Sequence, residues 1–398
     1  MSIRTGREFL SIPGPTNVPD PVLNALHQPA IEIYSGRLKD ITKTCLEDLK
    51  KIFRTTGDTY IYIANGHGAW EAALTNTLSR SDKVLVLESG RFAIGWGQMG
   101  DKLGVQMEVL SGNWHRAVNP EKVEERLKAD VNKEIKAVLV VQVDTASSVV
   151  NDIPAIRKAM DNAAHPALFM VDTIASLATM PFEMDDWGVD VAVAGSQKGL
   201  MMPPGLSYNA VGPKGKAAHK SADLRTQYWD WTAREAEIHY LKYCGTPPVH
   251  MLFAMRTAFD MLFEDGMDNI FKRHSILSRA VHAAVEKWSQ AGALSFNVSF
   301  VGERAPSVTT VNFLNQFNAE RFLTYCDQKL AVVLGIGIGE GEEQSFRIAH
   351  MGFVNAPMIL GTLSGVEIGL KALNIPHGSG GIEAAIEIIA DAVPADPG

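Results

Sequence analysis

An aspartate and a lysine each follow an apolar run, and these two residue types can do chemistry together. The run Ala167–Val171 leads into Asp172, and the run Val189–Ala194 leads through Gly-Ser-Gln to Lys198. Both runs are apolar and bounded by turn residues, which predicts buried strands of a parallel sheet. Because ligands of open α/β sheets bind beyond the carboxyl ends of the strands, we expect Asp172 and Lys198 to share one ligand site.

This pair of side chains suits pyridoxal phosphate. A lysine amine can hold the aldehyde of that cofactor, and a carboxylate can partner the nitrogen of its ring. At strand ends an aspartate is more often a helix cap and a lysine a solvated charge. The flanking residues favour the cofactor, since Lys198 lies between Gly-Ser-Gln and Gly199 in a tight turn, where glycine lets the backbone approach a ligand closely.

Longer motifs around both residues resemble the class-V aminotransferases of fold type I, and among them the serine/alanine/aspartate–glyoxylate group. They are Val-Asp-Thr-Ile-Ala-Ser-Leu from Val171, Gly-Ser-Gln-Lys-Gly from Gly195, and Pro-Pro-Gly from Pro203. The resemblance runs from about Ser11 to Leu373. It implies an α/β protein with an N-terminal arm (residues 1–20), a large cofactor-binding domain with a mainly parallel sheet (21–267) and a smaller α+β C-terminal domain (268–398).

The resemblance also implies a set of cofactor-binding residues. Asn65, Gly66 and His67 match the turn that cradles the phosphate, a position where a helix start offers free backbone N–H groups to an anion. The other matched positions are Phe92 for stacking on the ring, Thr145 for the ring oxygen, Gln197 for the phosphate, and Tyr243 and Thr246 for the phosphate of a partner subunit. Shared sites of this kind imply a homodimer or a larger homo-oligomer.

Substrate recognition is expected from Arg347, in the segment Phe-Arg-Ile-Ala-His-Met-Gly. It matches the family's arginine that clamps the substrate α-carboxylate, a task suited to a planar bidentate guanidinium. Tyr34 stands where relatives have an arginine, and Arg37 is a candidate to supply that cation instead. Asp144 replaces the glutamate that is usual before the hydroxyl residue, Thr145.

The implied reaction moves the amino group of a small L-amino acid to glyoxylate and yields glycine, with Lys198 also moving a proton. The donor is aspartate or serine, and Arg37 places aspartate slightly ahead. Alanine is an alternative donor, and a lyase or desulfurase of the same fold is an alternative activity. A desulfurase needs a mobile nucleophilic cysteine, whereas no glycine-rich loop holds Cys326. A non-enzymatic nucleotide- or carbohydrate-binding protein is the alternative from another class.

Composition narrows the class of protein further. The 398 residues are 46% hydrophobic with a formal net charge of −8, which argues against a general binder of nucleic acid. The three cysteines lie far apart, without zinc-ligand spacing or a disulfide framework, and the histidines have no metal-ligand spacing. No run of 18 uncharged apolar residues occurs, and the N-terminus lacks an apolar segment. We expect a cytoplasmic protein that binds no membrane and no metal.

From Tyr60 onward the chain is expected to alternate strands and helices as one continuous parallel unit that ends with the strand Leu206–Val211. Residues 1–20 are expected to be irregular and extended because prolines are frequent there. The segment Gly335–Gly341 reads as a glycine loop of the smaller domain, next to Arg347.

Overall fold

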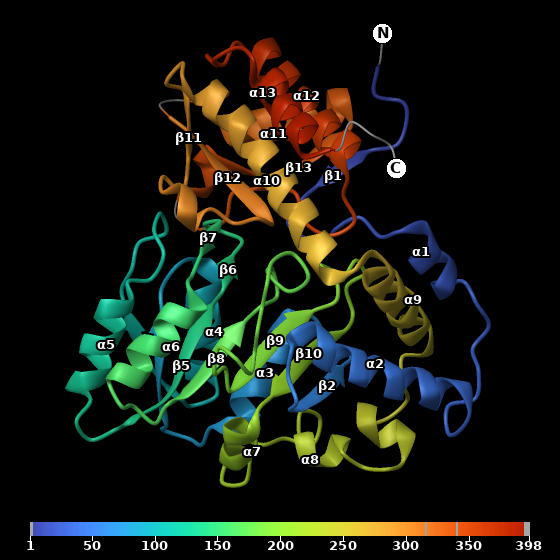
Figure 1. Ribbon diagram of the computed structural model, residues 1–398, viewed down its shortest axis with the longest axis vertical. Coiled ribbons are helices and arrows are strands. Elements are labelled where there is room, and N and C mark those ends of the chain that lie inside the picture. Colours follow the sequence, from blue (N-terminus) through green and yellow to red (C-terminus); the bar gives the residue numbers. More distant parts are fainter. Residues whose placement is uncertain (1–2, 315–316, 340, 394–398) are drawn as a thin grey trace.

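The computed structural model describes residues 3–314, 317–339 and 341–393, which form two main sheets with helices packed on them (Figure 1). The glycine loop expected at Gly335–Gly341 contains Glu340, which lies outside the described residues. The strands are β1 (Phe9–Ser11), β2 (Asp58–Tyr62), β3 (Lys83–Leu87), β4 (Gln106–Leu110), β5 (Ile135–Val141), β6 (Val143–Asp144), β7 (Val149–Val150), β8 (Leu168–Asp172), β9 (Val191–Gly195), β10 (Ser207–Val211), β11 (Leu294–Phe296), β12 (Val308–Phe313), β13 (Val332–Ile336) and β14 (Ser345–Ala349).

The helices include α4, which the sequence pattern does not predict. They are α1 (Asp20–Leu26), α2 (Arg37–Phe53), α3 (Gly66–Thr77), α4 (Arg91–Lys102), α5 (Pro120–Ala129), α6 (Ile153–Asn162), α7 (Pro213–His219), α8 (Trp231–Arg234), α9 (Val249–Asp265), α10 (Met267–Ser289), α11 (Ala319–Leu330), α12 (Ala356–Ala372) and α13 (Gly381–Ala392). Within the described part of the chain, no helix combines the length and the hydropathy needed to span a bilayer.

The larger sheet has the strand order β2-β10-β9-β8-β5-β3-β4, and its strands β9, β8, β5, β3 and β4 run parallel. The expected continuous parallel unit is wrong at β10, which pairs antiparallel with both β9 and β2. A parallel connection needs a crossover of a dozen or more residues, usually a helix. Residues 196–206 contain no helix, so the chain returns in the opposite direction.

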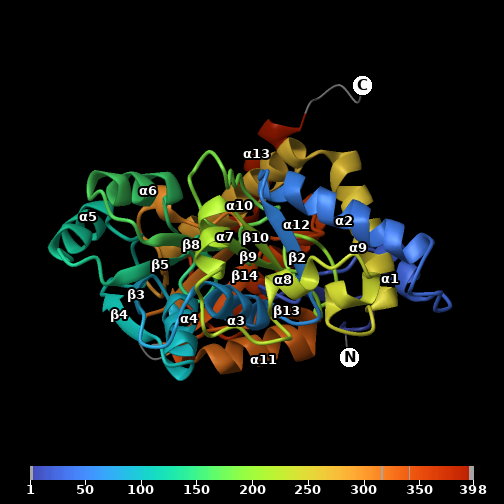
Figure 2. The same cartoon turned by 90° about the horizontal axis from the view of Figure 1, so that it is seen from below.

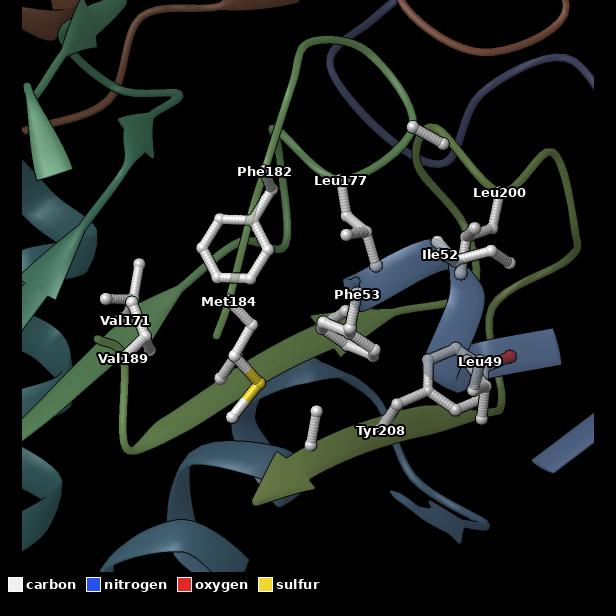
Figure 3. Close-up of a cluster of buried hydrophobic side chains, with 14 of the residues drawn as sticks. Leu49, Ile52, Phe53, Val171, Leu177, Phe182, Met184, Val189, Leu200 and Tyr208 are labelled. Carbon is white, nitrogen blue, oxygen red and sulfur yellow. The ribbon is translucent and has the colours of Figure 1, made fainter. Parts of the chain in front are cut away.

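Helices cover both faces of this sheet, with α3 and α4 on one side and α2 and α6 on the other (Figure 2). Alternate side chains of β8 serve the two faces: Leu168 and Met170 join the cluster of α3, and Phe169 and Val171 join that of α2. Figure 3 shows Phe53 from α2 in the cluster of Val171, with Phe182 and Met184 between these two side chains. A sheet covered on both faces explains the continuous apolar runs.

The smaller sheet has the order β1-β13-β14-β12-β11 and carries helices α10 to α13 (Figure 1). Its edge strand β1 comes from the N-terminal segment and pairs parallel with β13. The expectation of an irregular arm is therefore wrong for Phe9–Ser11. Helix α10 leads from the larger sheet to the smaller one, and the domain boundary at residues 267 and 268 stays a prediction.

Candidate active site

A cavity of about 230 Å³ lies at the carboxyl ends of β5, β8 and β9. It brings together eight of the residues selected from the sequence: Asn65, Gly66, His67, Phe92, Thr145, Asp172, Gln197 and Lys198. Trp70, Val141, Val143, Ile174 and Ala175 complete its lining. The rule that ligand sites form beyond the strand ends thus places Asp172 and Lys198 in one cavity.

Asp172 ends β8 and is 2% exposed, with both carboxylate oxygens occupied by donors. Oδ1 accepts a hydrogen bond from the backbone N–H of Ile174 (2.6 Å), and Oδ2 accepts one from Nε1 of Trp70 (2.8 Å). Burial raises the pKa of Asp172 to about 7, and the two donors oppose this rise. A cationic ring nitrogen beside the carboxylate favours its ionised form.

Lys198 follows β9 in a loop that the N-terminal segment holds in place. Its amine donates to the carbonyl of Pro13, while the hydroxyl of Thr16 donates to the Lys198 carbonyl (3.1 Å). Gly14 adopts φ +103°, and a Cβ there would lie 2.5 Å from the Lys198 amine. The N-terminal segment therefore needs glycine at this position to pass so close to the lysine.

Burial, followed by the positive charge of Arg347, lowers the pKa of Lys198 to about 8, while Asp172 opposes the shift. Only the neutral amine can attack an aldehyde, so apoenzyme should take up pyridoxal phosphate faster as the pH rises. We expect the rate, followed by visible absorbance, to level off above about pH 8. An unperturbed lysine, with a pKa of about 10.4, would give a rate that keeps rising to about pH 10. That profile would contradict this environment for Lys198.

The opposite wall of the cavity suits a phosphate group. Asn65 caps α3 by accepting from the backbone N–H of His67 (3.1 Å), and the start of this helix lines the cavity. Among the described residues, Oε1 of Gln197 is buried without a hydrogen-bond partner. The backbone N–H groups of a helix N-terminus are donors that a bound anion can satisfy, whereas the unpaired oxygen of Gln197 is an acceptor that a donor group of a ligand can satisfy. Together with the buried lysine and carboxylate, they fit pyridoxal phosphate.

Asp144 positions the aromatic wall of the cavity. Its Oδ2 accepts from the backbone N–H groups of Phe92 (2.8 Å) and Ala93 (3.0 Å), and so it caps α4. Gly90 leaves space for this contact, since a Cβ there would lie 2.3 Å from Cγ of Asp144. This arrangement gives a physical reason for the shorter acid: its carboxylate packs directly against the start of the helix that carries Phe92.

Arg347 lies on β14 beside the cavity and is 5% exposed. Its guanidinium donates to two carbonyl oxygens, those of Ile336 (2.6 Å) and Thr145 (2.9 Å). No ion pair involves it within the described part of the chain, and burial lowers its pKa to about 10. Asp144 opposes this shift from beyond ion-pair distance, and a buried cation with no carboxylate in direct contact is suited to bind the carboxylate of a ligand.

Four of the selected residues lie away from this cavity. Tyr34 is 68% exposed and packs against Tyr240, and Arg37 is exposed with its guanidinium over the ring of Phe253. Thr246 is also exposed. The roles expected for these three residues stay predictions.

Tyr243 is arranged differently from the other three. It is 1% exposed, and its hydroxyl lies 2.8 Å from Oγ1 of Thr42 inside its own chain. The structure of a single chain does not test a contact with a partner subunit, so the role expected for Tyr243 stays a prediction.

Sequence reasoning missed Trp70. Trp70 stands three residues after His67 on α3, so both side chains lie on the same face of that helix, toward the cavity. This spacing is the signal that points to Trp70. For the segment that holds Pro13 and Thr16, the family motif Pro-Gly-Pro-Thr implies a path close to the substrate, and the structure adds its contacts to the loop that carries Lys198.

Comparisons with known proteins find relatives along almost the whole chain. The aminotransferase class-V family model matches residues 9–343. This chain is 38% identical to a serine–glyoxylate aminotransferase of Methylorubrum extorquens over 385 residues, which is 95% of each chain. It is 34% identical to an L-aspartate–glyoxylate aminotransferase of Paracoccus denitrificans over 387 residues, which is 96% of each chain. The crystal structure of pyridoxamine–pyruvate aminotransferase from Mesorhizobium loti has a TM-score of 0.90 at 24% identity, covering 99% of this chain and 100% of that one. The family match spans all the residues that line the cavity.

Proposed function

The chain belongs to the class-V aminotransferases, which use pyridoxal phosphate, and we propose that it transfers the amino group of a small L-amino acid to glyoxylate. The products are glycine and the oxo acid that matches the donor. One observation carries this proposal: a lysine and a buried carboxylate line one small cavity, and a buried arginine lies beside it, bonded to the carbonyl of the lining residue Thr145. The names of the relatives from M. extorquens and P. denitrificans support glyoxylate as the acceptor.

We assign a different role in the reaction to each of three side chains. Bound pyridoxal phosphate supplies an electron-accepting ring that makes the Cα proton of the amino acid removable. Lys198 takes the proton from Cα of the donor and supplies a proton to Cα of the new amino acid in the second half-reaction, which its lowered pKa near 8 permits at neutral pH. Asp172 holds a proton at the ring nitrogen by staying a carboxylate. Arg347 holds the α-carboxylate of both substrates, so donor and acceptor occupy the same position in turn.

Serine is the donor that this chain's own residues favour. The case for aspartate depended on Arg37, which lies on α2 over Phe253 rather than in the cavity. Among the described residues that line the cavity there is no arginine, and Arg347 beside it is assigned to the α-carboxylate. The second carboxylate of aspartate would therefore lack a cation from the same chain, whereas serine carries no second charge.

Aspartate is the second candidate, because Arg37 is exposed and free to reach the cavity of another copy of the chain. The proposed active unit is a homodimer, in which Arg37, Tyr34 and Thr246 are the residues expected to lie near the partner's site.

The donor half-reaction tests this proposal. Holoenzyme is mixed with L-serine, L-aspartate or L-alanine without an acceptor, and the decay of the cofactor's visible band is followed by stopped-flow. We expect serine to react fastest, with no change in Arg37→Ala or in the control Lys39→Ala, which removes another exposed cation from α2. Fast decay with aspartate that slows only in Arg37→Ala would establish aspartate as the donor. If no amino acid discharges the band, the proposed function is wrong.

A further inference from the structure

Trp70 contacts the one carboxylate that faces the cofactor ring in the proposed function, on which this inference rests. We propose that Trp70 is a positioning residue: its indole N–H holds the Asp172 carboxylate in place and keeps it ionised. Both side chains line the same cavity, although they stand 102 residues apart in the sequence.

The geometry fixes the carboxylate from two sides. Nε1 of Trp70 lies 2.8 Å from Oδ2 of Asp172, and the backbone N–H of Ile174 lies 2.6 Å from Oδ1. With one donor on each oxygen, the carboxylate plane cannot rotate without breaking a hydrogen bond. Both bonds end on a charged acceptor away from water, where such bonds are strong.

The indole itself is held rigidly. Trp70 is buried and stacks on Trp96, with ring centroids 6.0 Å apart and planes 16° apart. The ring of His67 packs against it at 4.6 Å and that of Phe92 at 6.3 Å. Packing on several sides leaves the N–H group pointing at Asp172, so its orientation is set before any ligand binds.

Trp96 provides a contrast within the same stack. It is also buried, yet its Nε1 has no hydrogen-bond partner among the described residues. The two indoles are therefore packed alike and differ in their hydrogen bonds. The N–H of Trp70 donates to a carboxylate, whereas that of Trp96 has no acceptor among the described residues.

The charges around Asp172 explain why a donor matters there. Asp144 and burial favour the neutral acid, while Lys198 and the N–H groups of Trp70 and Ile174 favour the carboxylate. His67 lines the same cavity, and burial lowers its pKa, so it adds little positive charge at neutral pH. At neutral pH the neutral and the ionised forms of Asp172 are close in free energy, since the pKa of this group is about 7. Loss of the Trp70 donor shifts this balance toward the neutral acid.

Two matched substitutions, Trp70→Phe and Trp96→Phe, test the inference. The affinity of each apoenzyme for pyridoxal phosphate is measured by absorbance titration over a range of pH. We expect Trp70→Phe to raise the pKa of Asp172 by about one unit, which costs about tenfold in affinity at acid pH and little at alkaline pH. Trp96→Phe should follow the wild type. Identical pH profiles for the two variants would overturn the inference.

A second measurement does not require Trp70→Phe to fold. Apoenzyme labelled with fluorotryptophan is titrated by ¹⁹F NMR, with signals assigned by replacing the other tryptophans one at a time. The Trp70 signal should follow a titration near pH 7 that disappears in Asp172→Asn, while the Trp96 signal stays flat. A flat Trp70 signal would contradict the inference. If wild-type protein takes up no pyridoxal phosphate, the proposed function fails, and this titration of apoenzyme still decides the role of Trp70.

Discussion

Replacing Lys198 with alanine should lower the rate of transamination by about 10⁴-fold, because the same amine anchors the cofactor and moves the Cα proton. The lysine lies in the cavity with its pKa lowered to about 8, as a base that works at neutral pH requires. Steady-state formation of glycine from serine and glyoxylate measures the loss. A small primary amine added to the solution should restore part of the rate, since it can replace the missing base.

Lys214→Ala is a suitable control for that experiment. Lys214 is exposed, and it donates to the carbonyl of Ala167, just before β8 begins, at the end of the strand away from Asp172. We expect this variant to keep its rate within about threefold, since the lysine touches no residue of the cavity. Near-normal turnover in Lys198→Ala would contradict the assigned role.

Replacing Arg347 with lysine should raise the KM of both the amino donor and glyoxylate, and lower kcat/KM by about 100-fold. A lysine cannot reproduce the bidentate contact of a guanidinium with a carboxylate, and hydrogen bonds to charged groups contribute about 1.5–3 kcal/mol each. Equal losses for both substrates are expected because one arginine binds each of them in turn. Steady-state kinetics with each substrate varied separately gives the two KM values.

The chain offers a matched control for Arg347 in Arg234. This arginine is 3% exposed, and Nη1 donates to the carbonyls of Ile61 and Lys242, yet it does not line the cavity. Arg234→Lys should lower the temperature of unfolding and leave both KM values unchanged. Similar KM increases in the two variants would mean that Arg347 acts through the fold rather than on the substrates.

Local sequence patterns are enough to predict the strands that position the site. β8 and β9 are short apolar runs ended by turn residues, and the structure places each within two residues of the predicted bounds. The residues of β10 do not determine the direction of this strand, because the direction depends on the short connection from β9. Helix α4 was missed because it contains three glycines, Gly95, Gly97 and Gly100, and because Asp144, which caps it, stands 52 residues from Phe92.

The contacts that complete the site join distant parts of the chain. Trp70 reaches Asp172 across 102 residues, and the carbonyl of Pro13 meets the amine of Lys198 across 185. Such pairs have no periodicity, so only the folded arrangement of the sheets reveals them. The contact between the hydroxyls of Tyr243 and Thr42 is another long-range pair of this kind, across 201 residues.

The central claim, that Lys198 holds the cofactor in this cavity, can be tested by chemical trapping. Purified holoenzyme is reduced with borohydride to make the bond between lysine and cofactor permanent, and its peptides are then analysed by mass spectrometry. The structure predicts the added mass of the reduced cofactor on Lys198 alone. The same mass on another lysine, or an active enzyme with no modified lysine, would contradict the account.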